Sequence, residues 1–130
     1  MPNSHNFIRT GTAIVEMDRI DKLCSNSRFL ARFFSADEIR YIVSRSLSNS
    51  LIAENYCAKI AFAKAIGTGM RIVKPSEISI LRDRLGSPLL ITSGRAKMLE
   101  ERENYIINLS VAHCRSYATA SVIITKNLTT

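Results

Sequence analysis

One long helix constrains the fold of this chain more than any other segment. The helix is predicted from about Leu51 to Ile66, and Gly67 directly after it is a typical C-terminal cap. A single row of residues spaced at i, i+4 runs along it, namely Ile52, Tyr56, Ile60 and Lys64. The fold class therefore depends on which elements flank this helix.

The flanking segments alternate between helical and strand-forming patterns. Strands are predicted where β-branched and apolar residues dominate, over 7–17, 77–82, 89–93, 105–112 and 117–125. Shorter helices are predicted over 18–25, 28–34, 36–45 and 95–102. Ser35 and Glu38 form a capping box at the start of the third helix. This order, without repeats or a linker, predicts one α+β domain over residues 1–130.

The charge balance indicates an acidic partner. The 130 residues include 18 Lys and Arg against 11 Asp and Glu, which gives a net charge of +7. Such a chain favours a phosphate-bearing ligand, an acidic protein, nucleic acid or an anionic membrane. Nucleic acid is disfavoured, because there is no Trp and no compact Lys/Arg tract. No apolar run reaches transmembrane length and no signal peptide is recognisable, so we expect a cytoplasmic protein with no membrane partner.

The three cysteines do not predict a disulfide framework or a zinc site. Cys24, Cys57 and Cys114 are odd in number and widely spaced. Cys114 follows His113 directly, but adjacent residues on a strand point to opposite faces, so we do not expect a Cys–His catalytic pair within one subunit. Idle thiols in a reducing compartment are the simpler interpretation.

Several segments together resemble one known family. They are Gly-Thr-Ala-Ile-Val-Glu-Met-Asp-Arg-Ile (11–20), Arg-Phe-Leu-Ala-Arg-Phe-Phe (28–34), Lys-Ala-Ile-Gly-Thr-Gly (64–69), Leu-Gly-Ser-Pro (85–88) and Ser-Val-Ala-His (110–113). Their identity and order resemble the holo-acyl carrier protein synthases, which are small 4'-phosphopantetheinyl transferases. The segments span nearly the whole chain.

The resemblance implies a fold, an assembly and a reaction. It implies a compact α+β protomer with an antiparallel sheet and one long helix, assembling as a homotrimer with active sites between subunits. Family members transfer the phosphopantetheine arm of coenzyme A to a serine of acidic acyl carrier protein. For this chain it implies that Arg19, Arg28 and Arg32 form a carrier-docking face. Without the resemblance, these charges would indicate a solvated helix face.

The resemblance also implies a metal site that this sequence lacks. The family supplies Asp on the first strand and Glu on the long helix as Mg²⁺ ligands, and Ala13 and Ile60 occupy these positions. Neither offers the oxygen ligands that Mg²⁺ requires. Glu16 lies at an odd offset from Ala13 and so points to the opposite face of a strand, while Asp18 and Glu54 have no motif support. We therefore expect no metal site.

Other positions around the implied cleft are kept or changed. The resemblance assigns Lys59, Lys64, Gly67, Thr68, Gly69 and His113 to coenzyme A binding, with His113 and Lys64 as catalytic candidates. Without it, the glycines would be a plain helix stop and His113 a structural histidine. The family's Arg-Phe is replaced by Asn55-Tyr56, the residue after the histidine is Cys114, and the Lys of the Gly-Lys-Pro turn is Ser87. Ala13, Tyr56 and Ile60 are expected to shape a more apolar cleft.

Three functional hypotheses follow. The first is a divergent protein that binds acyl carrier protein or a coenzyme A ligand without the Mg²⁺-dependent mechanism, either acting on a carrier-tethered acyl chain or serving as an interaction protein, with no required cofactor. The second is an active transferase with an altered metal arrangement. The third, an engineered inactive variant, is disfavoured, because the further changes at Asn55, Tyr56 and Cys114 exceed what a knockout needs.

Overall fold

The computed structural model describes residues 7–127. Helices and strands follow one another as β1 (Ile8–Glu16), α1 (Met17–Cys24), α2 (Phe29–Phe33), α3 (Ala36–Ser44), α4 (Asn49–Ile66), the short 3₁₀ turns η2 (Gly69–Arg71) and η3 (Pro75–Glu77), β2 (Ile78–Arg82), β3 (Pro88–Thr92), α5 (Gly94–Glu103), β4 (Tyr105–His113) and β5 (Tyr117–Lys126). The α+β class and the type of every predicted element are confirmed.

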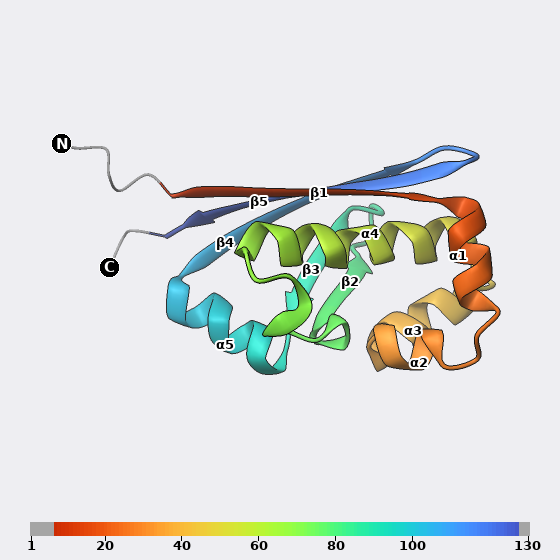
Figure 1. Cartoon of the computed structure of the whole chain (residues 1–130), viewed down its shortest axis with the longest axis horizontal. Helices are drawn as coiled ribbons and strands as arrows, with labels where there is room; N and C mark the ends of the chain where they lie inside the picture. Colours follow the sequence, from red (N-terminus) through yellow and green to blue (C-terminus); the bar gives the residue numbers. More distant parts are fainter. Residues whose placement is uncertain (1–6, 128–130) are drawn as a thin grey trace.

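The strands form two antiparallel sheets. The larger sheet has the order β1-β5-β4, so the N-terminal strand pairs with the C-terminal one, with Ala13 opposite Ala120. Strands β2 and β3 form a separate hairpin. In Figure 1 the long sheet lies above α4, whereas α1, α2 and α3 gather at one end of the molecule. The expected antiparallel arrangement is confirmed, and the five strands are divided between two sheets.

Helix α4 lies against one face of the larger sheet, and small residues allow the close approach. Gly11 of β1 is buried, and a Cβ there would overlap the carbonyl oxygen of Ala61 and approach the amide nitrogen of Ala65 to 2.8 Å. Only glycine fits, since the obstacle is rigid backbone. The strand that carries Ala13 and the helix that carries Ile60 are thus held in direct contact.

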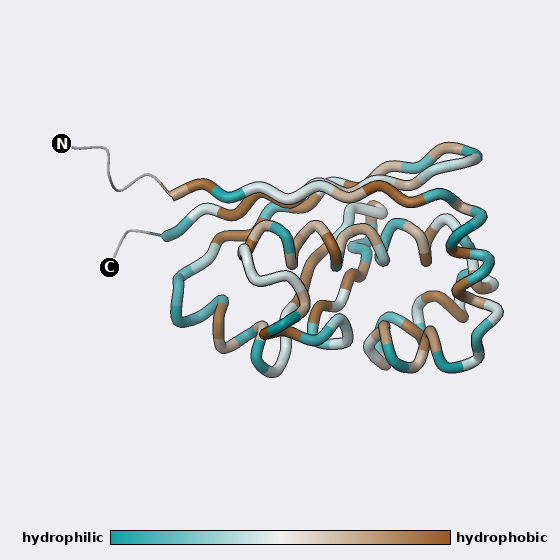
Figure 2. Tube along the Cα trace, viewed as in Figure 1, coloured by the Kyte–Doolittle hydropathy of each residue, from teal (hydrophilic) through white to brown (hydrophobic). Residues whose placement is uncertain are grey.

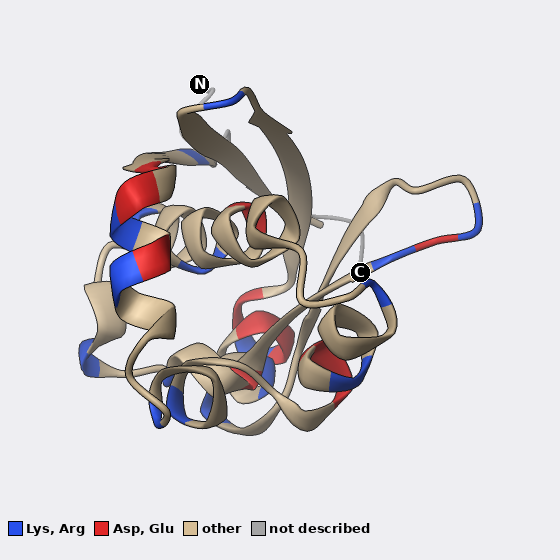
Figure 3. Cartoon of the chain, turned by 90° about the vertical axis from the view of Figure 1, so that its right-hand side faces the viewer, with Lys and Arg blue, Asp and Glu red and all other residues tan. Residues whose placement is uncertain are grey.

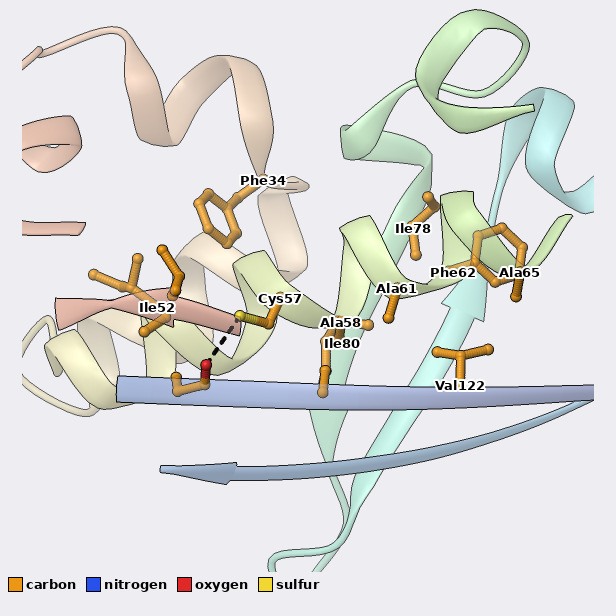
Figure 4. Packing of buried hydrophobic residues seen from close by; sticks show 14 of the residues in the cluster. Phe34, Ile52, Cys57, Ala58, Ala61, Phe62, Ala65, Ile78, Ile80 and Val122 are labelled. Atoms are coloured by element: carbon orange, nitrogen blue, oxygen red, sulfur yellow. Dashed lines mark hydrogen bonds between the residues drawn. The ribbon is translucent and has the colours of Figure 1, made fainter. Parts of the chain in front are cut away.

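The core fills the space between α4, the sheet and the hairpin. Figure 4 shows Ala58, Ala61 and Ala65 of α4 facing the strand that carries Val122. The thiol of Cys57 donates to the backbone oxygen of Ala118 across this layer, at 3.5 Å. Figure 2 shows that apolar residues recur along α4 and the strands, and those of the core are buried between these elements, which holds the layers together.

The start of α4 differs from the sequence prediction. The sequence predicted a helix from about Leu51, but the helix begins at Asn49. The Ser48 hydroxyl accepts from the Leu51 amide at 3.4 Å and so caps the helix two residues earlier than its apolar pattern indicates. Within residues 7–127, no helix is both long and apolar enough to span a membrane.

Candidate functional site

Ala13 and Ile60 line the same hollow. Ala13 is on β1, Ile60 is on α4, and the hollow has a volume of about 520 Å³. Its remaining lining residues are Thr12, Ile14, Lys64, Thr119, Ala120 and Ser121. The fold therefore brings these two positions together, as expected. Among the residues that line the hollow, only Lys64 is charged.

The hollow does not fit the Mg²⁺ ion that the resemblance implies. Mg²⁺ is held by hard oxygen ligands, usually including one or two carboxylates. No carboxylate lines this hollow, and its one charged lining residue, Lys64, carries a positive charge that repels a cation. Between residues 7 and 127, no group of three or more His, Cys, Asp or Glu side chains is arranged to hold a metal ion. Glu54, the carboxylate considered as a substitute, is bound to Arg82 and His113 instead.

Lys64 and the Gly67–Gly69 segment lie together at the C-terminal end of α4. The Lys64 ammonium donates to the backbone oxygen of Thr12 at 3.0 Å and is exposed. Gly67 has φ 85° and Gly69 has φ 59°, a left-handed conformation that favours glycine. Both glycines thus have a conformational role in ending the helix, and they also leave the backbone open beside Lys64.

Lys59 is not part of this group. Its side chain is fully buried, and its ammonium donates to Glu38 Oε1 at 2.6 Å, to the oxygen of Pro75 at 2.8 Å and to the oxygen of Ile78. An ammonium has three N–H donors, so none remains for a phosphate. Burial holds the pKa of Lys59 below its usual value, against the opposing effect of the Glu38 charge. The fold thus places Lys59 in the core, where its ammonium is not free to bind a ligand.

Glu38 links three parts of the fold through its carboxylate. Oε1 accepts from the Ser35 amide at 2.9 Å, and Oε2 accepts from the Ile80 amide at 3.1 Å and from Asn55 Nδ2 at 3.2 Å. Asn55 also donates to the oxygen of Ile80 at 3.0 Å, while its own Oδ1 is buried without a hydrogen-bond partner. The sequence predicted only the local part of this network, the capping box of Ser35 and Glu38. The contacts of Glu38 with Asn55 and Ile80 have no signal in the sequence.

Tyr56 does not shape the hollow at Ala13 and Ile60. Its ring stacks on Phe33 with a centroid distance of 5.0 Å and lies 6.1 Å from Phe29. A tyrosine side chain is long enough to reach the neighbouring helix, where aromatic surface is available. The expected three-residue apolar cleft is therefore corrected to Ala13 and Ile60, with Tyr56 in a separate aromatic cluster against α2.

His113 ends β4 and lies in a different part of the chain from Lys64. Its Nδ1 is 2.8 Å from Glu54 Oε2, and Arg82 Nη2 donates to Glu54 Oε1 at 3.0 Å. His113 lines two hollows, of about 560 Å³ beside α1 and about 370 Å³ beside the β2–β3 hairpin. Glu54 and Arg82 were not predicted as partners of His113, because they are 59 and 31 residues away in the sequence and belong to no local motif.

The three predicted docking arginines are exposed. Arg28 and Arg32 line one hollow on α2, together with Phe29 and Phe33. Arg19 lies on α1, where acidic and basic residues alternate, as Figure 3 shows. Within the described chain, none of the three forms an ion pair. Arg28, directly before α2, and Arg32, on α2, therefore lie at one hollow without an ion pair.

The described helices and strands define an α+β protein in which one long helix lies against an antiparallel sheet. A model of the 4'-phosphopantetheinyl transferase superfamily matches residues 9–121. The chain belongs to this family.

Named relatives agree with this assignment. A holo-[acyl-carrier-protein] synthase of Clostridium botulinum is 39% identical over 115 residues, covering 88% of this chain and 94% of the relative. The crystal structure of the Neisseria meningitidis synthase superposes with a TM-score of 0.85 at 29% identity, over 91% of this chain and 98% of that one. The Bacillus anthracis synthase, solved in complex with CoA (3',5'-ADP), has a TM-score of 0.78 at 28% identity, over 94% and 99% of the two chains.

Proposed function

We propose that this chain binds acyl carrier protein, or a coenzyme A or phosphopantetheine ligand, and does not use the Mg²⁺-dependent transfer mechanism of its family. Its cleft either acts on a carrier-tethered acyl chain or serves a non-catalytic interaction. One observation carries the proposal: Ala13 and Ile60 face a common hollow in which no carboxylate is available. Metal-assisted transfer depends on such ligands, since the cation neutralises charge on the phosphates.

The remaining groups support an anionic ligand. Lys64 is exposed beside the open backbone of Gly67, Thr68 and Gly69, and a lysine with such a backbone can hold a phosphate without metal. The structure of the Bacillus anthracis relative was solved with CoA (3',5'-ADP), which supports coenzyme A as the first ligand to test. The apolar lining from Ile14, Ile60 and Ala120 suits an acyl or pantetheine chain better than a hydrated ion.

An acidic carrier protein is the partner that the surface charge favours. The exposed Arg28 and Arg32 lie one helical turn apart and have no acidic partner within residues 7–127. Unpaired arginines steer an acidic partner towards the site, in a manner that added salt weakens. The double charge reversal Arg28→Glu with Arg32→Glu should therefore weaken carrier binding more than the single reversal Arg95→Glu on α5.

The transfer reaction itself decides between the proposal and its alternative. Apo carrier protein, coenzyme A and Mg²⁺ are incubated with the chain, and mass spectrometry follows the holo form of the carrier. We expect no Mg²⁺-dependent holo product, whereas coenzyme A binding persists by calorimetry without metal. Formation of the holo form at an ordinary turnover rate would overturn the proposal and establish an active transferase with an altered metal arrangement, as the names of the relatives favour.

A restoration experiment tests whether the binding surfaces are retained. The double variant Ala13→Asp with Ile60→Glu places two carboxylates in the hollow, and we expect it to acquire Mg²⁺-dependent transfer. Each single variant is the matched control, because one carboxylate leaves the ligand set incomplete. If the double variant folds, binds Mg²⁺ and still transfers nothing, the cleft has been rebuilt for another ligand.

A further inference from the structure

His113, Glu54 and Arg82 form a continuous chain of polar contacts contributed by three elements. Glu54 is on α4, Arg82 ends β2 and His113 ends β4. We propose that His113 and Glu54 are a proton-accepting pair, in which Nε2 of His113 takes the proton of a substrate hydroxyl and Glu54 is the positioning residue. This goes beyond the proposed function, because it assigns acid–base chemistry to groups outside the hollow at Ala13 and Ile60.

Burial fixes the carboxylate. The side chain of Glu54 is 13% exposed and that of Arg82 is 6% exposed, so little water competes for their contact. Arg82 holds Oε1 at 3.0 Å, which leaves Oε2 directed to His113 Nδ1 at 2.8 Å. Because the partners sit on a helix and two strands, the imidazole is oriented by rigid elements rather than by a loop.

The contact also fixes the tautomer of the imidazole. A carboxylate in an ion pair offers only acceptors, so Nδ1 of a neutral His113 must carry the hydrogen. The lone pair is then on Nε2, which makes no hydrogen bond within residues 7–127. The side chain is 45% exposed and lines two hollows, so Nε2 is open to a ligand. An oriented carboxylate behind an imidazole is the arrangement by which a histidine serves as a general base.

The step that the pair performs is a single proton transfer. The O–H bond of the hydroxyl breaks, its electron pair stays on the oxygen, and a new N–H bond forms at Nε2. The imidazolium that results is stabilised by the negative charge of Glu54, which keeps its own charge throughout. Arg82 keeps Glu54 in position and takes no part in the transfer.

The position of the proton can be measured without any substrate. The chain contains two histidines, His5 and His113, so nitrogen NMR of ¹⁵N-histidine protein gives two imidazoles, and His113→Gln identifies the relevant one. At a pH where the spectrum reports a neutral ring, we expect His113 to be protonated on Nδ1. Glu54→Gln keeps an oxygen for Arg82 but turns an amide donor to Nδ1, so the hydrogen should move to Nε2.

A matched control and a second readout separate positioning from folding. Glu101→Gln removes an exposed carboxylate on α5 and should leave the His113 signals unchanged. Carbethoxylation by diethyl pyrocarbonate, followed by mass spectrometry, should be slower at His113 in Glu54→Gln than in Glu101→Gln. Any turnover that uses the pair should fall by about 10²–10⁴-fold in Glu54→Gln.

The result that overturns the proposal is equally direct. A neutral His113 protonated on Nε2 in the wild-type chain, or signals that Glu54→Gln leaves in place, would show that the carboxylate does not set the tautomer. This outcome is independent of coenzyme A, carrier protein and Mg²⁺. The proposed role of His113 and Glu54 can therefore be disproved while the proposed function holds. Equally, the proposed function can be disproved while the role of this pair holds.

Discussion

Lys59 shows how a single residue can match a family pattern and still serve the interior. The ammonium and the Glu38 carboxylate are both fully buried, and each has its remaining bonding capacity satisfied by backbone groups. Such a pair contributes little net stability while intact, since desolvation opposes the attraction. The protein is strongly destabilised, however, when one member of the pair is removed, because the other charge stays buried without a partner.

The first prediction concerns this pair. Lys59→Met should lower the free energy of unfolding by about 3–5 kcal/mol, because the Glu38 charge is left buried without its partner. Urea denaturation measures the change. Arg40→Met breaks the exposed pair with Asp37 and should cost less than about 1 kcal/mol. Equal losses in the two variants would contradict the buried role of Lys59.

Cys57 supplies a prediction about pH. Burial, aided by the charge of Glu54, raises the pKa of its thiol from 9.0 to about 11. Below about pH 9 the Cys57 thiol is protonated in the folded and in the unfolded chain, so its contribution to the free energy of unfolding is fully present. Above that, the unfolded chain loses the proton first, so stability falls until the pH passes about 11.

The measurable difference is the slope of stability against pH. From about pH 8 to about pH 10, Cys57 should account for a loss of about 1.4 kcal/mol, the equivalent of one pKa unit. Cys57→Ser and Cys57→Ala should both remove this part of the decline, since neither side chain titrates there. A slope that both variants leave unchanged would refute the assignment.

At the scale of elements, the contact between β1 and α4 is the most sharply determined. Gly11→Ala places a methyl group against the backbone of Ala61, where neither partner can move without shifting a whole element. We expect a loss of about 3 kcal/mol or more in thermal or urea unfolding. Thr10→Ala, on the exposed side of the same strand, should cost less than about 1 kcal/mol. A stable Gly11→Ala protein would mean that the two elements do not approach this closely.

The sequence predicted the elements well because their signals are local. The capping box at Ser35, the Gly67 stop and the β-branched, apolar residues of β5 each act over a few residues, and each element forms where it was expected. The pairing of strands into two sheets was missed, since register and partner choice depend on contacts between distant segments.

The candidate site was predicted only in part, because some of its residues are defined by contacts between distant segments. Ala13 and Ile60 were placed together by their family positions, and the fold brings them to one hollow. Lys59 was misplaced and Glu54 was not recognised, because the roles of both depend on tertiary contacts to Glu38, Arg82 and His113. No spacing along the chain reports such contacts.

At the scale of the whole molecule, the outer face of the larger sheet is left uncovered in a single chain. Ile8, Ile14, Ile106 and Ile123 on this sheet are 45–67% exposed. Isolated apolar residues on a surface need no explanation, but several on one sheet indicate an association surface. The homotrimer that the resemblance implies would cover such a surface, and it stays a prediction.

The assembly prediction follows. Ile14→Glu should convert a trimer to monomers in light scattering or sedimentation, because a charge would be buried in the contact. Met98→Glu, which replaces a 69% exposed residue on α5, is the control and should leave the mass unchanged. A wild-type chain that is monomeric at micromolar concentration would remove the basis for a shared site.

The buried bond between Lys59 and Glu38 has a consequence for the position beside it. Successive residues of a helix point about 100° apart, so with Lys59 fixed in the interior, Ile60 is fixed towards the hollow. Helix α4 cannot rotate to present Glu54 in its place. Under the proposed function, a carboxylate therefore reaches this hollow only by substitution of a residue that already lines it, such as Ala13 or Ile60, or from another molecule. The packing of the core, rather than the surface of the hollow, keeps Glu54 out of it.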